Sequence, residues 1–101
     1  MSDEVAHVRG WFLKAESDFA TAKHMLNTGG PYDTACFHAQ QAVEKYLKGF
    51  LALNAQPFPF THNLEKLQQL GESAVPAWPL KGLDLAELTV FAVQTRYDFE
   101  F

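Results

Sequence analysis

Hydrophobic positions in the first quarter of the chain repeat at alternating steps of three and four residues. The series consists of Val5, Val8, Phe12, Ala15, Phe19, Ala22 and Leu26. Because an α-helix turns once in about 3.6 residues, this spacing predicts an amphipathic helix over residues 5–26. The helix should end at residues 27–31, since Gly29 and Gly30 can adopt the left-handed cap and Pro31 suits the first turn of a following helix.

A second and broader apolar face predicts a helix over residues 32–53. Its apolar members are Ala35, Cys36, Ala39, Ala42, Val43, Tyr46, Leu47, Phe50 and Leu53. The small residues come first and the large ones last, so a neighbouring helix can approach closely near the beginning of this one. The short link between the two helices predicts an antiparallel hairpin.

Two prolines end the second helix. Pro57 and Pro59 each remove a backbone donor and bias the preceding residue towards extended geometry. The surrounding segment 54–60 is apolar, and we expect it to pack against the domain. A short helix follows over residues 63–73, with Thr61 or Asn63 available as its N-cap. Three leucines share one side of this helix: Leu64, Leu67 and Leu70.

The last quarter of the chain predicts a connector and a fourth helix. Residues 74–81 contain two prolines and Trp78, which favours a rigid connector. Residues 83–97 predict a helix, because a lone strand over the β-branched run 89–93 would have nothing to pair with. Its apolar members are Leu85, Leu88, Ala92 and Tyr97. The patterns together predict an all-α fold, an up-and-down antiparallel bundle of four helices in a single domain over residues 1–101.

Composition limits what such a domain can do. The chain has 101 residues, of which 48% are hydrophobic and 20% charged, so it suits one small core and not a disordered chain. A formal net charge of −4 argues against a protein that binds long nucleic acid through nonspecific phosphate contacts. Aromatic residues make up 14% of the chain, and we expect some of these rings to face a partner.

The sequence also predicts a cytoplasmic protein that does not contact a membrane. Cys36 is the single cysteine, cannot form an internal disulfide and falls in an apolar helical pattern. The N-terminus opens with acids, unlike the basic and then apolar layout of a signal peptide. No uncharged run reaches the roughly 18 residues of a membrane span without a proline.

The residues most suited to binding a ligand lie on one side of the predicted second helix. At about 100° per residue, His38, Gln41, Lys45 and Lys48 lie within roughly 80° of one another, and we call them the polar strip. The two ammonium groups could hold the phosphate of a nucleotide or RNA while the imidazole and the amide hydrogen-bond to it. The alternative is a solvated helix face, on which Glu44 and Lys48 make an i,i+4 pair worth a few tenths of a kcal/mol.

Other candidates are fewer, and several common sites are missing. His62 stands at a helix start, where it can cap or position the first turn, and the guanidinium of Arg96 can clamp a phosphate through two hydrogen bonds. Gly29 and Gly30 lack the further glycines, the lysine and the preceding strand of a phosphate-binding loop. The four histidines are scattered, without the spacing of a metal site, and no nucleophile elbow is present. We therefore predict no metal, no cofactor and no acyl transfer.

Residues 36–51, CFHAQQAVEKYLKGFL, resemble the signature second helix of the HEPN-domain family, named for nucleotide binding in higher eukaryotes and prokaryotes. The similarity continues in the family's order through the region of Trp11 and Asp18, the segment 61–64 (THNL) and the segment 95–98 (TRYD). The resemblance thus covers nearly the whole chain.

The resemblance implies a helical bundle that is usually a homodimer and is often encoded beside a minimal nucleotidyltransferase, as a toxin–antitoxin-like pair. Many such relatives are metal-independent ribonucleases, in which an arginine and a histidine four to six residues later converge on the scissile phosphate from both protomers. Arg96 can be matched to that arginine, but residues 97–101 contain no histidine. Relatives also usually continue into another helix after this arginine, so the chain looks short by one element.

Three hypotheses follow. The favoured one is a non-catalytic HEPN-family dimer that binds a nucleotide or a nucleotidyltransferase partner. The second is a metal-independent RNase toxin that uses Arg96, with His38 or His62 in place of the missing histidine. The third is an interaction module whose polar strip is only solvated surface. The candidate ligand contacts of the favoured hypothesis are His38, Gln41, Lys45, Lys48 and Arg96.

A bundle without its closing helix should leave apolar side chains uncovered, among them Phe99 and Phe101. Because a large exposed apolar patch favours association, we expect the domain to be completed by a partner.

Overall fold

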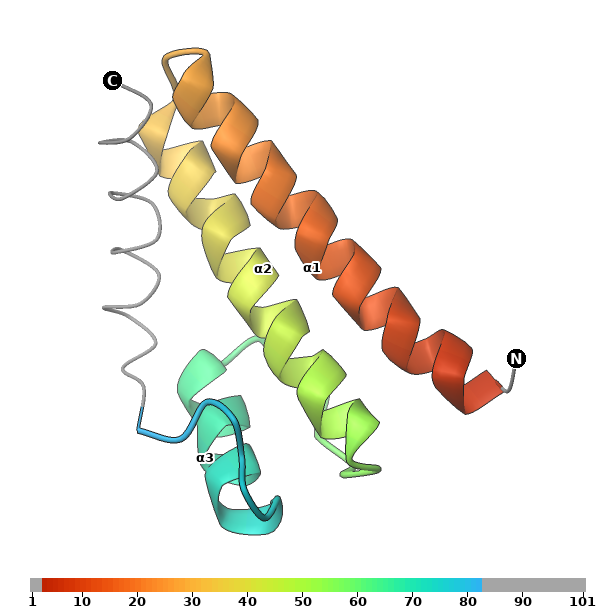
Figure 1. Ribbon diagram of the computed structural model, residues 1–101. Helices are drawn as coiled ribbons and strands as arrows, with labels where there is room; N and C mark the ends of the chain where they lie inside the picture. The colour runs from red at the N-terminus through yellow and green to blue at the C-terminus, as the bar shows by residue number, and fades with distance from the viewer. Residues whose placement is uncertain (1–2, 83–101) are drawn as a thin grey trace.

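A computed structural model describes residues 3–82 of the chain. These residues form the helices α1 (Asp3–Asn27), α2 (Tyr32–Leu53) and α3 (Leu64–Ala74), and they contain no strand (Figure 1). The all-α prediction is confirmed for this part of the chain. The predicted fourth helix over residues 83–97 lies outside the described residues, as does Arg96.

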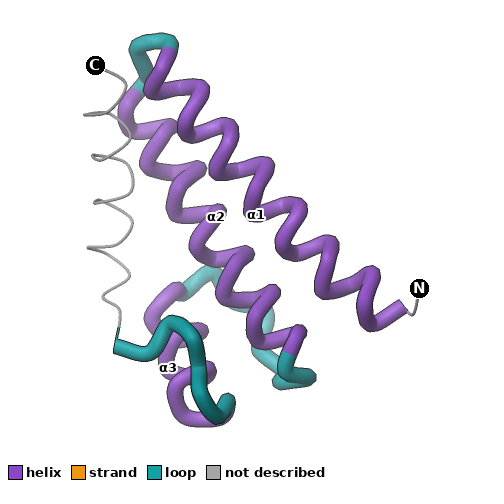
Figure 2. Tube along the Cα trace, viewed as in Figure 1, coloured by secondary structure: helices purple, strands orange, loops and turns teal. Residues whose placement is uncertain are grey.

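A glycine turn joins α1 and α2 into the predicted antiparallel hairpin, which is the long pair of helices in Figure 2. Gly29 and Gly30 have φ angles of 91° and 122°, in the region that residues with side chains rarely adopt. The N–H of Gly30 donates to the carbonyl of Met25 at 2.8 Å, which closes the last turn of α1. The predicted glycine cap is therefore confirmed, and α2 begins directly after Pro31.

The two long helices pack through small residues at the turn and through rings at the other end. Near the turn, one cluster of buried side chains joins the helices and consists of Ala22, Leu26, Ala35 and Ala39. Further along α2, Gly49 leaves space for Phe12, since a Cβ at position 49 would lie 2.8 Å from that ring. Phe12 also meets Phe50 edge-on, with 5.3 Å between ring centroids. The gradient from small to large residues along α2 thus sets how closely α1 can approach.

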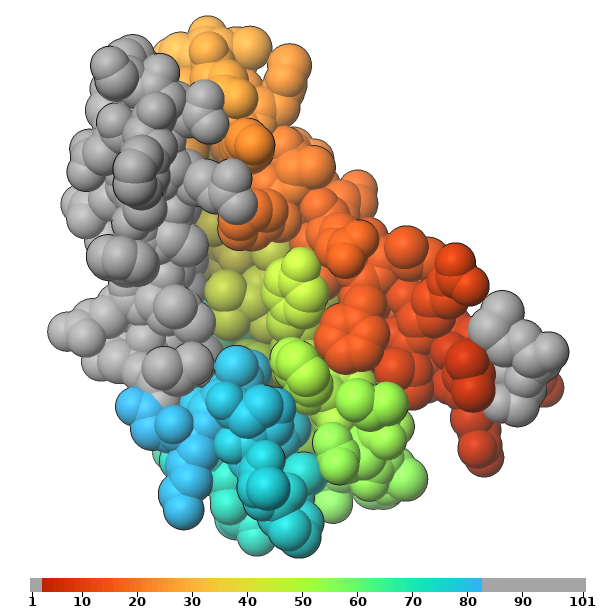
Figure 3. Space-filling view, viewed as in Figure 1, coloured from red at the N-terminus to blue at the C-terminus, as the bar shows by residue number. Residues whose placement is uncertain are grey.

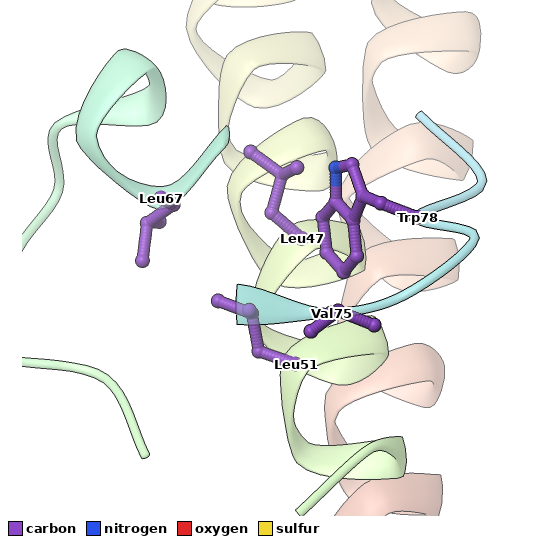
Figure 4. Close-up of a cluster of buried hydrophobic side chains, with 5 residues drawn as sticks. All are labelled: Leu47, Leu51, Leu67, Val75 and Trp78. Carbon is purple, nitrogen blue, oxygen red and sulfur yellow. The ribbon is translucent and has the colours of Figure 1, made fainter. Parts of the chain in front are cut away.

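A second core joins α2 to α3 and to the segment that follows α3. Its buried members are Leu47, Leu51, Leu67, Val75 and Trp78 (Figure 4). The indole N–H of Trp78 donates to Oε1 of Gln68 at 2.8 Å, and the side-chain amide of Gln68 donates to the carbonyl of Leu80. The segment predicted as a connector is therefore part of the core, because the indole fills the space beside α2 and its N–H has a partner.

The start of α3 and the loop before it differ slightly from the prediction. Asn63 is the N-cap, and its side chain accepts a hydrogen bond from the backbone N–H of Lys66 at 3.1 Å, so α3 begins and ends one residue later than expected. Phe58 packs against Trp11 with 6.0 Å between ring centroids, as expected for an apolar loop. Phe60, however, is 96% exposed.

α2 is the central element of the described structure. It lies between α1 and α3, which pack on different sides of it (Figure 1). Within residues 3–82, no helix combines the length and the apolar character that a membrane span needs.

We expect Gly71→Ala to destabilise the protein, because the new Cβ would lie 2.2 Å from the ring of Trp78. Overpacking of this kind costs about 1–3 kcal/mol of unfolding free energy, measured by urea denaturation. The matched control is Gly10→Ala in α1, where a Cβ meets nothing within 4 Å and the helix should gain up to about 1 kcal/mol. Equal effects of the two substitutions would contradict the described packing of Trp78.

Candidate functional site

The polar strip of α2 faces α1 along part of its length, and one carboxylate of α1 meets two of its members. The carboxylate of Asp18 lies 3.0 Å from Nδ1 of His38 through Oδ1 and accepts a hydrogen bond from Nζ of Lys45 through Oδ2. His38 and Lys45 are two helical turns apart, so Asp18 binds them from between. All three side chains are more than two-thirds shielded from solvent. The contact ties the middle of α2 to α1.

The environment of Asp18 favours its charged form. Burial alone would raise the pKa of this carboxyl, but hydrogen bonds from Lys45 and His38, together with their positive charge, outweigh it and hold the pKa below the ordinary value of 3.8. The carboxylate is therefore ionised throughout the neutral range, and it neutralises the ammonium group that it binds.

The second lysine of the strip is buried in a different cluster. Nζ of Lys48 donates to Oε2 of Glu44 at 3.1 Å, and only 5% of either side chain is exposed. Nδ1 of His62 lies 3.1 Å from both oxygens of the same carboxylate. The i,i+4 pairing of Glu44 with Lys48 is confirmed, but the alternative of a solvated helix face is wrong for this pair, because both side chains are buried.

Two aromatic rings lie near the ammonium group of Lys48, and of these the Trp11 ring contributes to its shielding from water, because Phe60 is itself exposed. Nζ of Lys48 lies 5.3 Å from the centroid of the Trp11 ring, which comes from α1, and 5.9 Å from that of Phe60, which comes from the loop before α3. Trp11 is held in turn by its indole N–H, which donates to Nε2 of His7 at 3.3 Å, and by Phe58. The ring faces supply part of the favourable electrostatics that the ammonium group loses with its water.

The structure thus divides the predicted site into two ion clusters. We call them the Asp18 cluster (Asp18, His38, Lys45) and the Glu44 cluster (Glu44, Lys48, His62). Gln41 is half-buried between them and makes no side-chain hydrogen bond to the described residues. His62 was expected to cap or position α3. Asn63 is the cap, and His62 anchors the loop to α2.

Sequence reasoning placed neither acid in the candidate site: Asp18 entered only through the family resemblance, and Glu44 only as the partner of Lys48 on a solvated face. Asp18 comes three residues after Ala15 and four before Ala22, so it borders the buried face of α1, and this spacing is a signal that could have identified it. For Glu44 the pairing with Lys48 could be read from the sequence. Its burial could not, since the groups around the pair, Trp11 and His62, come from two other segments.

The arrangement limits the chemistry of the strip. Each lysine is matched by a carboxylate of the same chain, so neither ammonium group is left to neutralise a phosphate. His62 is the most accessible member, with 70% of its side chain exposed. In the described part of the chain, no group of three or more His, Cys, Asp or Glu side chains could hold a metal ion.

Comparison with known proteins gives one match. A family model described as HEPN domain matches residues 8–101, which is nearly the whole chain. No curated protein and no solved structure matches significantly.

The burial of the Glu44 cluster leads to a prediction about the stability of the protein. Glu44→Gln leaves the buried ammonium of Lys48 without its counter-ion, which should cost about 3–5 kcal/mol of unfolding free energy in urea denaturation. The double variant Glu44→Gln/Lys48→Met removes both charges at similar volume and should return to within about 1 kcal/mol of wild type. A single variant as stable as the double one would contradict the buried pair.

The Asp18 cluster predicts a pH dependence. Because the folded pKa of Asp18 lies below the unfolded value, its contribution to stability is complete above that value and is lost as the pH falls through the folded pKa. Asp18→Asn should therefore lower the unfolding free energy by about 1–3 kcal/mol near pH 7, between the values for exposed and buried pairs. The deficit should shrink in acid.

The control for this series is Glu72→Gln, an exposed carboxylate of α3 without an ion pair in the described structure. It should change the unfolding free energy by less than about 0.5 kcal/mol. A deficit of Asp18→Asn that stays constant from neutral to acid pH would refute the ionic role of Asp18.

Proposed function

The chain belongs to the HEPN-domain family, and on that premise we propose that it is a non-catalytic helical binding domain, a dimer whose further partner is a protein of the nucleotidyltransferase class. In this proposal residues 1–101 form one domain, with a fourth helix over residues 83–97. The single observation that carries it is that both lysines of the polar strip are neutralised inside the chain. The strip therefore holds the helices together and leaves binding to other surfaces.

Phosphate binding at the polar strip would break contacts that hold the helices together. To reach a phosphate, Lys48 would have to leave a carboxylate and two ring faces in a site where it is 5% exposed. Lys45 would have to leave Asp18, whose charged form depends on that contact. The formal charge of −4 adds a long-range repulsion of polyanions. These costs favour a protein partner over a nucleotide.

Exposed aromatic side chains support a protein partner. Tyr32 and Phe37 on the first half of α2 are about half exposed, and Phe60 is almost fully exposed. Aromatic side chains are the commonest anchors of protein interfaces, because they bury a large area for little loss of conformational freedom. The nucleotidyltransferase class comes from the family resemblance.

One observation favours a second function, metal-independent RNA cleavage with Arg96. Glu44 binds Nδ1 of the exposed His62, an arrangement that orients an imidazole so that its other nitrogen can act as a general base. In this alternative His62 takes the place of the missing motif histidine.

The proposal predicts the outcome of a titration of ATP, GTP and a short single-stranded RNA against the full chain, in which bound ligand and RNA integrity are both followed. We expect no saturable binding and no cleavage, for wild type and for Lys45→Ala alike. Coexpression with a nucleotidyltransferase encoded beside the gene should give a copurifying complex. Lys81→Ala, which alters an exposed lysine, is the control.

Two results would contradict this function. Saturable nucleotide binding that Lys45→Ala abolishes and Lys81→Ala retains would assign the strip to phosphate. RNA cleavage that is lost in both His62→Gln and Arg96→Ala would assign the chain to the ribonucleases.

A further inference from the structure

His62 is an exposed imidazole that is held at one of its two nitrogens. Its Nδ1 lies 3.1 Å from both carboxylate oxygens of Glu44, and 70% of its side chain is exposed. The ring of Phe60 meets the imidazole edge-on, with 5.8 Å between ring centroids. The loop that carries both rings joins α2 to α3 in the half of the molecule away from the glycine turn, where green and blue atoms form the surface in Figure 3. The imidazole is therefore both oriented and accessible.

The carboxylate decides which nitrogen of the neutral ring carries the lone pair. A carboxylate accepts hydrogen bonds and cannot donate them, so the proton of the neutral imidazole lies on Nδ1 and the lone pair on Nε2. Glu44 is fixed in turn by Nζ of Lys48 at 3.1 Å. A nucleophile, a partner that orients it and a third group that fixes the partner are the components of an activated nucleophile.

The surroundings of His62 suit a phosphoryl group. The ammonium of Lys48 balances Glu44, so the Glu44 cluster carries no net charge while the imidazole is neutral, and it does not repel a phosphate dianion. α3 begins two residues after His62, and the N–H groups of Leu64 and Glu65 make no hydrogen bond to the described residues. These N–H groups and the positive end of the helix dipole favour a negative group near the start of α3.

The four histidines differ in access and in partner. His38 has a carboxylate partner, but only 28% of its side chain is exposed. Nε2 of His7 accepts a hydrogen bond from the indole N–H of Trp11. His24 is exposed and forms no ion pair with the described residues. His62 combines an exposed side chain with a carboxylate on the opposite nitrogen.

We propose that Nε2 of His62 accepts a phosphoryl group from an acyl phosphate. The lone pair of Nε2 attacks phosphorus and forms a P–N bond, while the P–O bond to the acyl group breaks and the carboxylate leaves with the bonding electrons. The proton stays on Nδ1, where Glu44 stabilises the positive charge that the ring acquires. The product places a phosphoryl group, with its negative charge and acceptor oxygens, on the surface beside α3.

An acyl phosphate suits this nucleophile because its leaving group is weakly basic, and a neutral imidazole displaces such a group most readily. Proton transfer by the same imidazole would need a substrate bound beside it, whereas phosphoryl transfer needs only access of the donor to Nε2. Neither the dimer nor the partner of the proposed function is required for this step.

Incubation of the full chain with acetyl phosphate tests the acceptor, with phosphoryl occupancy of each histidine followed by tandem mass spectrometry and the P–N bond by phosphorus NMR. We expect His62 to react at least about tenfold faster than His24, because His24 has no carboxylate to stabilise the charged ring. His62→Gln should lose the P–N signal, and the matched variant His24→Gln should retain it.

The double variant Glu44→Gln/Lys48→Met tests the role of the carboxylate in a cluster that keeps its volume. It should bring the rates at His62 and His24 to within about threefold of each other. His24 is an internal reference in the same molecule, so a lower rate at His62 alone does not come from lost fold.

Equal rates at the two histidines of wild type would overturn the proposal, because they would show only the ordinary reactivity of an exposed imidazole. The absence of a phosphoryl group on His62 would do the same, as would a rate ratio that the double variant leaves unchanged. Each of these results would leave the proposed function standing.

Discussion

The buried pair of Glu44 and Lys48 is the interaction on which the described structure depends. An ammonium group can be removed from water only where other groups replace its hydration, and here the replacements come from α1 and α2. Trp11 contributes a ring from α1 and Glu44 a carboxylate from α2, and His62 of the loop before α3 contacts the same carboxylate. The pair thus makes the positions of α1, α2 and that loop depend on one another. Phe58 of the same loop packs against Trp11 and the core, whereas Phe60 is 96% exposed.

The Asp18 cluster fixes the position of α1 relative to α2 in the hairpin. The alanine contacts near the turn let α1 and α2 approach closely. They do little to fix the position of one helix along the other, because the alanine side chain is too small to interlock with its neighbours. A carboxylate bound between His38 and Lys45 has one position along α2 in which both contacts are made. The polar strip thus makes contacts inside the chain, and those of Asp18 with His38 and Lys45 specify the register of α1 against α2.

Ion pairs are found where the helices of the described structure pack together. Within residues 3–82, lysines that lie against other helices have carboxylate partners, whereas Arg9 and Glu16 on the outer flank of α1 have none. Other exposed charges, such as Glu72 and Lys81, are likewise without an ion pair among the described residues. The chain therefore neutralises its lysines where helices pack against one another, while its exposed charges are left to solvent.

The sequence by itself determined the class of fold, the bounds of α2, the glycine turn, the cap region of α3 and, through residues 36–51, the family. These features are local, because helical periodicity, glycine conformation and capping depend on neighbours within a few residues. Only the tertiary structure decided that Lys48 is buried, that Asp18 joins His38 to Lys45 and that Trp78 belongs to the core. Periodicity shows which side of a helix a residue is on, but not which distant segment covers that side. Burial and the pairing of charges depend on which segment packs on that side. They decide whether a lysine is available to a ligand or is bound by a carboxylate of its own chain.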